Sequence, residues 1–105
     1  MKQTYRLLET NVEEWAEDKG IFSKGNPTAQ ALKTIEESNE LLDAIDKEDR
    51  AEIVDALGDI LVTLIIQAKM QNLDLLECLQ SAYDVISKRS GVMKDGMFIK
   101  EKASN

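Results

Sequence analysis

Residues 50–72 constrain the fold of this 105-residue chain most strongly, because this segment is apolar in almost every direction around a helix. From Ala56 to Ala68, almost every direction around the helix is occupied by Leu, Ile, Val or Ala. A helix that is apolar on all sides is buried on all sides. Since the length supports only one domain, the pattern predicts a central helix or a subunit interface, and we expect at least a dimer.

Three other segments show apolar residues at helical spacing, and turn residues separate them. Gly20 is a predicted helix stop, and residues 25–28, Gly-Asn-Pro-Thr, predict a turn into the next helix. Asp74 is a predicted N-cap. We therefore expect an all-α four-helix bundle, followed by a short extended arm over residues 92–105. The helices are predicted at about residues 3–19, 28–45, 50–72 and 74–89.

The composition excludes several kinds of site. The chain has no histidine, which excludes Ser-His-Asp and Cys-His catalysis and any histidine-based metal site. A single cysteine, Cys78, forms neither an intrachain disulfide nor a zinc cluster and indicates a reducing compartment. Because we find no signal-like start and no long apolar run, we expect a cytoplasmic protein without a membrane partner. The net charge of −7 argues against a nucleic-acid partner.

The excess negative charge is concentrated in residues 36–59. This window has ten carboxylates and two basic residues, a net charge of −8, whereas the rest of the chain has ten acidic and eleven basic residues. The ten carboxylates are Glu36, Glu37, Glu40, Asp43, Asp46, Glu48, Asp49, Glu52, Asp55 and Asp59.

Six of these carboxylates form two acidic helix faces. Like charges three or four residues apart destabilise a helix by a few tenths of a kcal/mol per pair, roughly, so the arrangement calls for a compensating cation. The two faces consist of Glu36, Glu37 and Glu40, and of Glu52, Asp55 and Asp59.

A solvated acidic face is the simpler interpretation of the other four carboxylates, which lie in or near the predicted connection. It fits Asp59 poorly, because this residue lies at the start of the apolar stretch, where we expect it to be buried. A buried carboxylate is costly unless it is paired or binds a metal. Antiparallel packing of the second and third helices would bring both acidic faces together, and an all-oxygen site suits Mg²⁺ first and Mn²⁺ next. The spacing of an EF-hand is absent.

Two acidic motifs resemble those of the MazG-like branch of the all-α nucleoside triphosphate pyrophosphohydrolases. The first is Glu36-Glu37-x-x-Glu40, and the second is Glu52-x-x-Asp55, followed by Ala-Leu-Gly-Asp-Ile at residues 56–60. That superfamily includes dimeric dUTPases and phosphoribosyl-ATP pyrophosphohydrolases. Residues 15–21 resemble the N-terminal segment of the family, and residues 77–101 resemble the C-terminal half of short, phage-type members.

The resemblance implies one MazG-like domain over residues 1–105, assembled as a dimer or dimer of dimers. It also implies cleavage of a (d)NTP between the α and β phosphates to a (d)NMP and pyrophosphate, for control of the nucleotide pool or house-cleaning. Many relatives end the second acidic motif on the aspartate of the Gly-Asp pair, with a glutamate three residues earlier. Here that aspartate is Asp59, and the glutamate position is Ala56. The Mg²⁺ ligands implied by the family pattern are Glu37, Glu40, Glu52 and Asp55, with Glu36 assisting. Because of the alanine at position 56, which two of Glu52, Asp55 and Asp59 contact the metal is left open.

Glu36 and Glu37 are the candidate general bases, since the chain has no histidine. Lys88 and Arg89 open a basic stretch and are the preferred phosphate contacts, although a lysine-rich tail also serves solubility. Trp15, with Lys19 from the same N-terminal segment, is a candidate substrate contact that stacks on the base, and a core or interface tryptophan is the alternative.

Two rival functions remain open at this point. One is a non-catalytic helical interaction module whose acidic face binds a basic partner. The other is a homologue that binds metal without turnover, which the alanine at position 56 favours. As an enzyme, the protein is expected to act on a nucleoside triphosphate with Mg²⁺, or Mn²⁺ as a substitute, and to form a homodimer or homotetramer.

Overall fold

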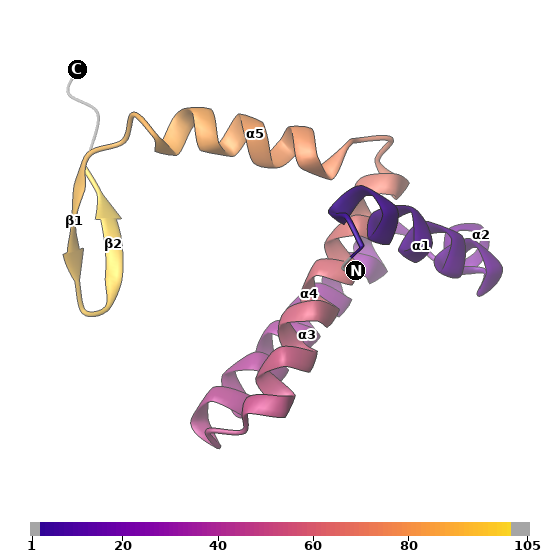
Figure 1. Cartoon of the computed structure of the whole chain (residues 1–105), viewed down its shortest axis with the longest axis horizontal. Helices are drawn as coiled ribbons and strands as arrows, with labels where there is room; N and C mark the ends of the chain where they lie inside the picture. The colour runs from indigo at the N-terminus through magenta and orange to yellow at the C-terminus, as the bar shows by residue number, and fades with distance from the viewer. Residues whose placement is uncertain (1–2, 102–105) are drawn as a thin grey trace. The chain divides into compact units, whose positions relative to one another are not determined.

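The computed structural model describes residues 3–101, which separate into two compact parts between Leu75 and Leu76 (Figure 1). The described residues form five helices, four of them of seven residues or more, and one two-stranded sheet. The prediction of an all-α fold is thus confirmed for the main elements. The elements are α1 Tyr5–Asp18, α2 Ile21–Lys24, α3 Pro27–Asp46, α4 Arg50–Met70, α5 Leu75–Ile86, β1 Gly91–Lys94 and β2 Met97–Lys100.

The predicted helix boundaries in the first part are confirmed by their capping residues. Gly20 follows the C-cap of α1 and has φ 78°, a left-handed conformation that glycine adopts without a steric penalty. The side chain of Asn26 accepts a hydrogen bond of 2.8 Å from the backbone N–H of Ala29, and Pro27 occupies the first turn of α3. The single turn of α2 was not predicted, because four residues are too few to show a helical period.

Helices α3 and α4 lie antiparallel and side by side (Figure 1). Their connection is short: Lys47 caps α3, and the Asp49 side chain caps α4 by accepting a hydrogen bond of 3.1 Å from the backbone N–H of Glu52. At the opposite end of the pair, Gln67 Nε2 donates a hydrogen bond of 2.9 Å to the carbonyl oxygen of Pro27. The pairing places the second half of α3 against the first half of α4, where the acidic faces are.

The core of the chain is small. Its buried apolar side chains, most of them alanines, are Ala16, Ala44, Ala56, Ile65, Ile66 and Ala68. The expectation that α4 is buried on all sides is wrong for the single chain, since Val54, Leu57 and Leu61 are 65%, 55% and 42% exposed. Only α3 and α1 contact α4 extensively, and they cover only part of its circumference.

A polar cluster fastens α1 to the residue that precedes α5. The buried carboxylate of Glu9 accepts hydrogen bonds from Tyr5 Oη at 2.7 Å and from Arg6 Nη1 at 3.0 Å. Arg6 also donates two hydrogen bonds, of 3.0 and 2.8 Å, to the carboxylate of Asp74. Burial, reinforced by the hydrogen bond to Glu9, raises the pKa of Tyr5 to about 12, so its hydroxyl remains a donor at neutral pH.

The C-terminal arm is a β-hairpin rather than a simple extended segment. Strands β1 and β2 pair antiparallel, with Val92 opposite Ile99. The two residues between them, Asp95 and Gly96, both have positive φ, at 51° and 79°, as a tight hairpin turn of Asp-Gly type requires. The Asp-Gly pair between alternating residues was the sequence signal for this hairpin. Residues 102–105 of the predicted arm lie outside the described residues.

No helix within the described range is long and apolar enough to cross a membrane.

Replacing Glu48 with glycine is expected to stabilise the connection between α3 and α4. Glu48 has φ 54°, and a left-handed conformation costs an L-residue about 1 kcal/mol or more. Thermal unfolding should show Glu48→Gly to be more stable than Glu48→Ala, which removes the same charge but keeps the Cβ atom. Equal stability of the two variants would show that this backbone conformation carries no strain.

Candidate metal centre

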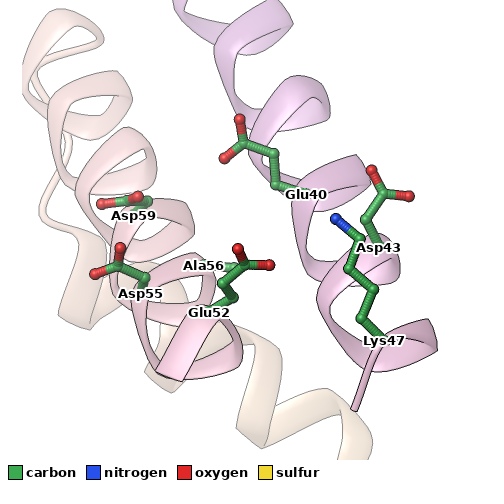
Figure 2. Close-up of a pocket in the computed structure, with 7 residues that line it drawn as sticks. All are labelled: Glu40, Asp43, Lys47, Glu52, Asp55, Ala56 and Asp59. Atoms are coloured by element: carbon green, nitrogen blue, oxygen red, sulfur yellow. The ribbon is translucent and has the colours of Figure 1, made fainter. Parts of the chain in front are cut away.

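Carboxylates from α3 and α4 line a cavity of about 350 Å³. Figure 2 shows that the lining side chains come from these two neighbouring helices, with Glu40, Asp43 and Lys47 on one and Glu52, Asp55, Ala56 and Asp59 on the other. The helical spacing of the acidic residues and the antiparallel packing of α3 against α4 create this arrangement. The lining residues are Glu40, Asp43, Lys47, Glu52, Asp55, Ala56 and Asp59.

Three carboxylates converge closely at one end of the acidic surface. Glu37, Glu40 and Asp59 each offer one oxygen, and these three oxygens all lie within 4.8 Å of one another. Two of the residues come from α3 and one from α4, so the cluster forms only where the two helices meet. The predicted approach of the two acidic faces is therefore present in the fold.

Glu37 is the most enclosed of the three, with 12% of its side chain exposed. Its Oε2 atom is buried and has no hydrogen-bond partner among the described residues. Proton sharing with the adjacent Glu40 carboxyl raises the pKa of Glu37, and burial and the charges of Glu40 and Asp59 act in the same direction. The amine of Lys33, 3.9 Å from Glu37, opposes the shift. When both glutamates are ionised, neither carboxylate can donate a hydrogen bond to the other.

This cluster fits a divalent cation. Oxygen ligands of Mg²⁺ lie about 2.1 Å from the ion, so two ligands of one ion are separated by about 3 to 4 Å. The oxygens of Glu37, Glu40 and Asp59 are close to this spacing, and small side-chain rotations suffice to reach it. Within residues 3–101, no lysine or arginine forms an ion pair with Glu40 or Asp59. A cation would therefore offset repulsion that the chain leaves largely uncompensated.

The other predicted acidic residues are distributed unevenly around the cluster. Glu52 and Asp55 line the cavity with Asp59 but do not belong to the three-carboxylate group. Glu36 is 57% exposed and forms an ion pair of 3.3 Å with Lys33, outside the cavity lining. Lys33 was not predicted as the ion-pair partner of Glu36, although its position three residues earlier on a helix indicates such a pair.

Asp59 is exposed, contrary to the expectation that it is buried. Its neighbour Ala56 is the buried residue of this turn. Asp59 instead borders the open cavity, because the apolar side chains near it in sequence point to other sides of α4. Asp59 therefore lies close to Glu37 and Glu40 at an exposed position, not at a buried one.

Two cavity residues were missed as site candidates. Asp43 was assigned to a solvated acidic face, yet it lines the cavity one turn after Glu40. Lys47 is the cation of this lining, as far as the described residues go. Their spacing from Glu40, three and seven residues, is the helical repeat that could have identified both.

Trp15 and Lys19, two of the four predicted substrate contacts, are not among the residues that line the carboxylate cavity. Trp15, on α1, is 49% exposed, so it is not a core residue of the single chain. Lys19 is the C-cap residue of α1. Lys88 and Arg89 follow α5 in the second part of the chain, where both are exposed. Their role in substrate binding remains a prediction.

Comparison with known protein families identifies the family to which this chain belongs. The family model described as the MazG nucleotide pyrophosphohydrolase domain matches residues 26–92, well over half of the chain. The chain belongs to this MazG family. The match begins just before α3 and ends within β1, so it includes all the acidic residues of the cavity. The family resemblance predicted from the two acidic motifs is confirmed.

Two similar proteins come from bacteriophages. A protein of Haemophilus phage HP1, described as an uncharacterized 18.2 kDa protein in the rep-hol intergenic region, is 36% identical over 64 residues. The match covers 61% of this chain and 39% of that protein, so the chain spans less than half the length of its relative.

A solved structure shares the fold. It is the cyanophage S-2L MazG-like pyrophosphohydrolase bound to dGDP and three catalytic Mn²⁺ ions per active site. The superposition has a TM-score of 0.77 at 22% identity and covers 99% of both chains.

Mn²⁺ is expected to stabilise the folded chain by offsetting the repulsion among the clustered carboxylates. Saturating Mn²⁺ should raise the melting temperature by about 5 °C or more. In Glu40→Gln, the metal-free protein should melt slightly higher than the wild type, because a repelling charge is removed, while the response to Mn²⁺ should largely disappear. Differential scanning fluorimetry with and without Mn²⁺ measures both effects.

Asp46→Asn is a matched control, because Asp46 is an exposed carboxylate at the end of α3 and is not part of the cavity lining. Its Mn²⁺ response should equal that of the wild type. A response lost equally in Asp46→Asn and Glu40→Gln would indicate diffuse charge screening instead of a metal centre.

Proposed function

We propose that this protein is a Mg²⁺-dependent nucleoside triphosphate pyrophosphohydrolase that converts a (d)NTP to a (d)NMP and pyrophosphate. The observation that carries the proposal is the convergence of Glu37, Glu40 and Asp59, within a chain of the MazG nucleotide pyrophosphohydrolase family. The cyanophage S-2L structure, bound to dGDP and three catalytic Mn²⁺ ions, supports a nucleotide substrate and divalent metal. Control of the nucleotide pool or house-cleaning in the cytoplasm is the proposed role.

Glu37, Glu40 and Asp59 are the proposed ligands of a Mg²⁺ ion, for which Mn²⁺ can substitute. Glu52 and Asp55 line the same cavity and are proposed to hold a further ion. This larger ligand set is consistent with the several ions of the S-2L protein. It also accommodates the departure at Ala56: both acidic registers of α4 face the cavity, with the small alanine between them.

Divalent metal, when bound, neutralises charge on the phosphates and lowers the pKa of water. The side chains must still orient the attacking water and accept its proton. Glu37 is proposed as this base, because its buried Oε2 atom has no hydrogen-bond partner among the described residues and can accept a proton. Glu36 was the other candidate, but its contact with Lys33 supports a role in positioning Lys33 and the start of the acidic face.

The remaining substrate contacts are proposed from charge and exposure. Half-exposed Trp15 offers a flat surface for stacking on the base, and Lys19 lies four residues later on the same helix end. Lys88 and Arg89 offer positive charge to the phosphates. An acidic cavity needs such cations, because a triphosphate is itself strongly anionic.

A pyrophosphate-release assay tests the enzyme proposal. With Mg²⁺ and a panel of standard and modified nucleotides, the wild type should release pyrophosphate from at least one. Glu40→Gln should reduce kcat/KM on the order of 100-fold, because it removes a metal ligand. Asp46→Asn should retain wild-type activity. Metal binding without release from any nucleotide would favour a homologue that binds metal without turnover.

We also propose that a second copy of the chain covers the exposed apolar face of α4. Val54, Leu57, Leu61 and Leu64 recur at helical spacing on the side of α4 away from Asp59, and they are 37% to 65% exposed. An apolar stripe of this size usually marks an interface.

Gly58 lies within this same face of α4. Glycine inside a helix costs about 1 kcal/mol relative to alanine. Apart from its chain neighbours and the adjacent backbone of α4, no atom of the described residues lies within 4 Å of the position that a Cβ would occupy. Close approach of a helix from another copy would account for the glycine. The proposed assembly is a homodimer, or a homotetramer formed from two such dimers.

Gly58→Ala and Leu61→Glu test this interface. Leu61→Glu should convert the dimer to a monomer by light scattering at micromolar concentration, because a buried charge opposes association. If a second copy packs on Gly58, Gly58→Ala should weaken the dimer; in an uncovered helix it should instead raise stability by about 1 kcal/mol. A wild-type protein that is monomeric under these conditions would exclude the proposed dimer.

A further inference from the structure

Neutral polar side chains fill the interface between α3 and α4 on the side of the carboxylates that faces away from the connecting turn. Thr34 Oγ1 donates a hydrogen bond of 2.9 Å to Thr63 Oγ1, which itself donates a bond of 2.6 Å to the carbonyl oxygen of Ile60. Gln30 Nε2 lies 3.4 Å from the carbonyl oxygen of Thr63. Both Gln30 and Thr63 are buried, and Thr34 is half-buried, so water has limited access to these bonds.

These contacts lie one helical turn from the carboxylate cluster on both helices. Thr34 precedes Glu37 by three residues on α3, and Thr63 follows Asp59 by four residues on α4. The bond between the two threonines is thus the next contact along the antiparallel pair after the approach of Glu37 and Asp59. It joins the two helices directly, whereas the carboxylates repel each other.

Apolar packing alone does not define how α3 and α4 meet. Helix α4 carries apolar side chains on several faces, and the buried residues of the two helices nearest the cavity are the small alanines Ala44 and Ala56. A slip by one turn moves a residue by about 5.4 Å, more than the 4.8 Å within which the three carboxylate oxygens lie. Such a slip also removes the partners of buried hydroxyl and amide groups, which is costly.

We propose that Thr34 and Thr63 are positioning residues that fix the rotation and register of α3 against α4, so that Glu37, Glu40 and Asp59 meet around a divalent ion. The inference rests on the metal site of the proposed function. It adds that the hydroxyl pair, which touches neither metal nor substrate, determines the affinity of that site.

The double variant Thr34→Val/Thr63→Val tests this role with nearly isosteric side chains. Replacing both partners of a buried hydrogen bond with apolar groups of the same shape is close to neutral for stability. The metal-free melting temperature should therefore stay near that of the wild type, while Mn²⁺ affinity, measured by isothermal titration calorimetry, should fall about 10- to 100-fold. A merely structural role would lower stability without this selective loss of affinity.

Three further variants sharpen the result. Thr34→Val alone removes the bond to Thr63 and the weaker contact of 3.3 Å with the Gln30 carbonyl within α3, but leaves the bond from Thr63 to Ile60. It should therefore reduce Mn²⁺ affinity even if the double variant does not fold. Thr34→Ser/Thr63→Ser keeps both hydroxyls and should restore affinity close to that of the wild type. Thr10→Val removes a hydroxyl that bonds only the Arg6 carbonyl within α1, at 3.0 Å, and should leave affinity unchanged.

The outcomes separate this inference from the proposed function. Wild-type Mn²⁺ affinity in Thr34→Val, or in a folded double variant, overturns the positioning role. A wild type that binds no Mn²⁺ overturns the metal site and this inference together. A wild type that binds Mn²⁺ and loses affinity in the valine variants, but releases no pyrophosphate from any nucleotide, supports the positioning role and overturns only the enzymatic proposal.

Discussion

Electrostatic repulsion between the carboxylates of α3 and α4 is the constraint on which the rest of this structure depends. Glu37, Glu40 and Asp59 are brought within a few ångströms of one another, although their charges oppose the approach. The chain compensates only in part, through Lys33 beside Glu36 and Glu37. The favourable contacts that hold the helices together must therefore lie elsewhere along the pair, in buried alanines and in the hydrogen bonds of threonine and glutamine side chains.

Most of the helices could be predicted from the sequence, because their ends are encoded locally. Gly20 with its left-handed backbone and Asn26 with Pro27 determine where α1 ends and α3 begins. The hairpin was not predicted from the apolar spacing of the arm, although the Asp95-Gly96 turn is itself a local signal for it. The burial of α4 could not be predicted for one chain, since its periodicity shows that it needs partners but does not show whether they belong to the same chain.

For the candidate site, the acidic residues could be predicted from the sequence, but their grouping in space could not. The two acidic motifs identified the carboxylates of α3 and α4, and a helical wheel was enough to group them by face. Their spacing within a motif did not show that Asp59 approaches Glu37 and Glu40 while Glu52 and Asp55 line the adjoining cavity. That difference depends on the register of two helices, which is a tertiary property. Asp43 and Lys47 were not predicted as site residues for a related reason: their helical spacing puts them on the same side of α3 as Glu40, but only the packing of α4 makes that side a cavity wall.

The neutral character of the contacts between Thr34 and Thr63 and between Gln67 and Pro27 has a consequence for the robustness of the fold. Hydroxyl and amide groups do not titrate near neutral pH, and salt does not screen their short hydrogen bonds as it screens exposed ion pairs. The contacts that align the two helices are thus uncharged, whereas the carboxylate site between the helices is strongly charged. Changes in ionic strength or in free divalent metal can alter the occupancy of the carboxylates while the alignment of the two helices stays the same.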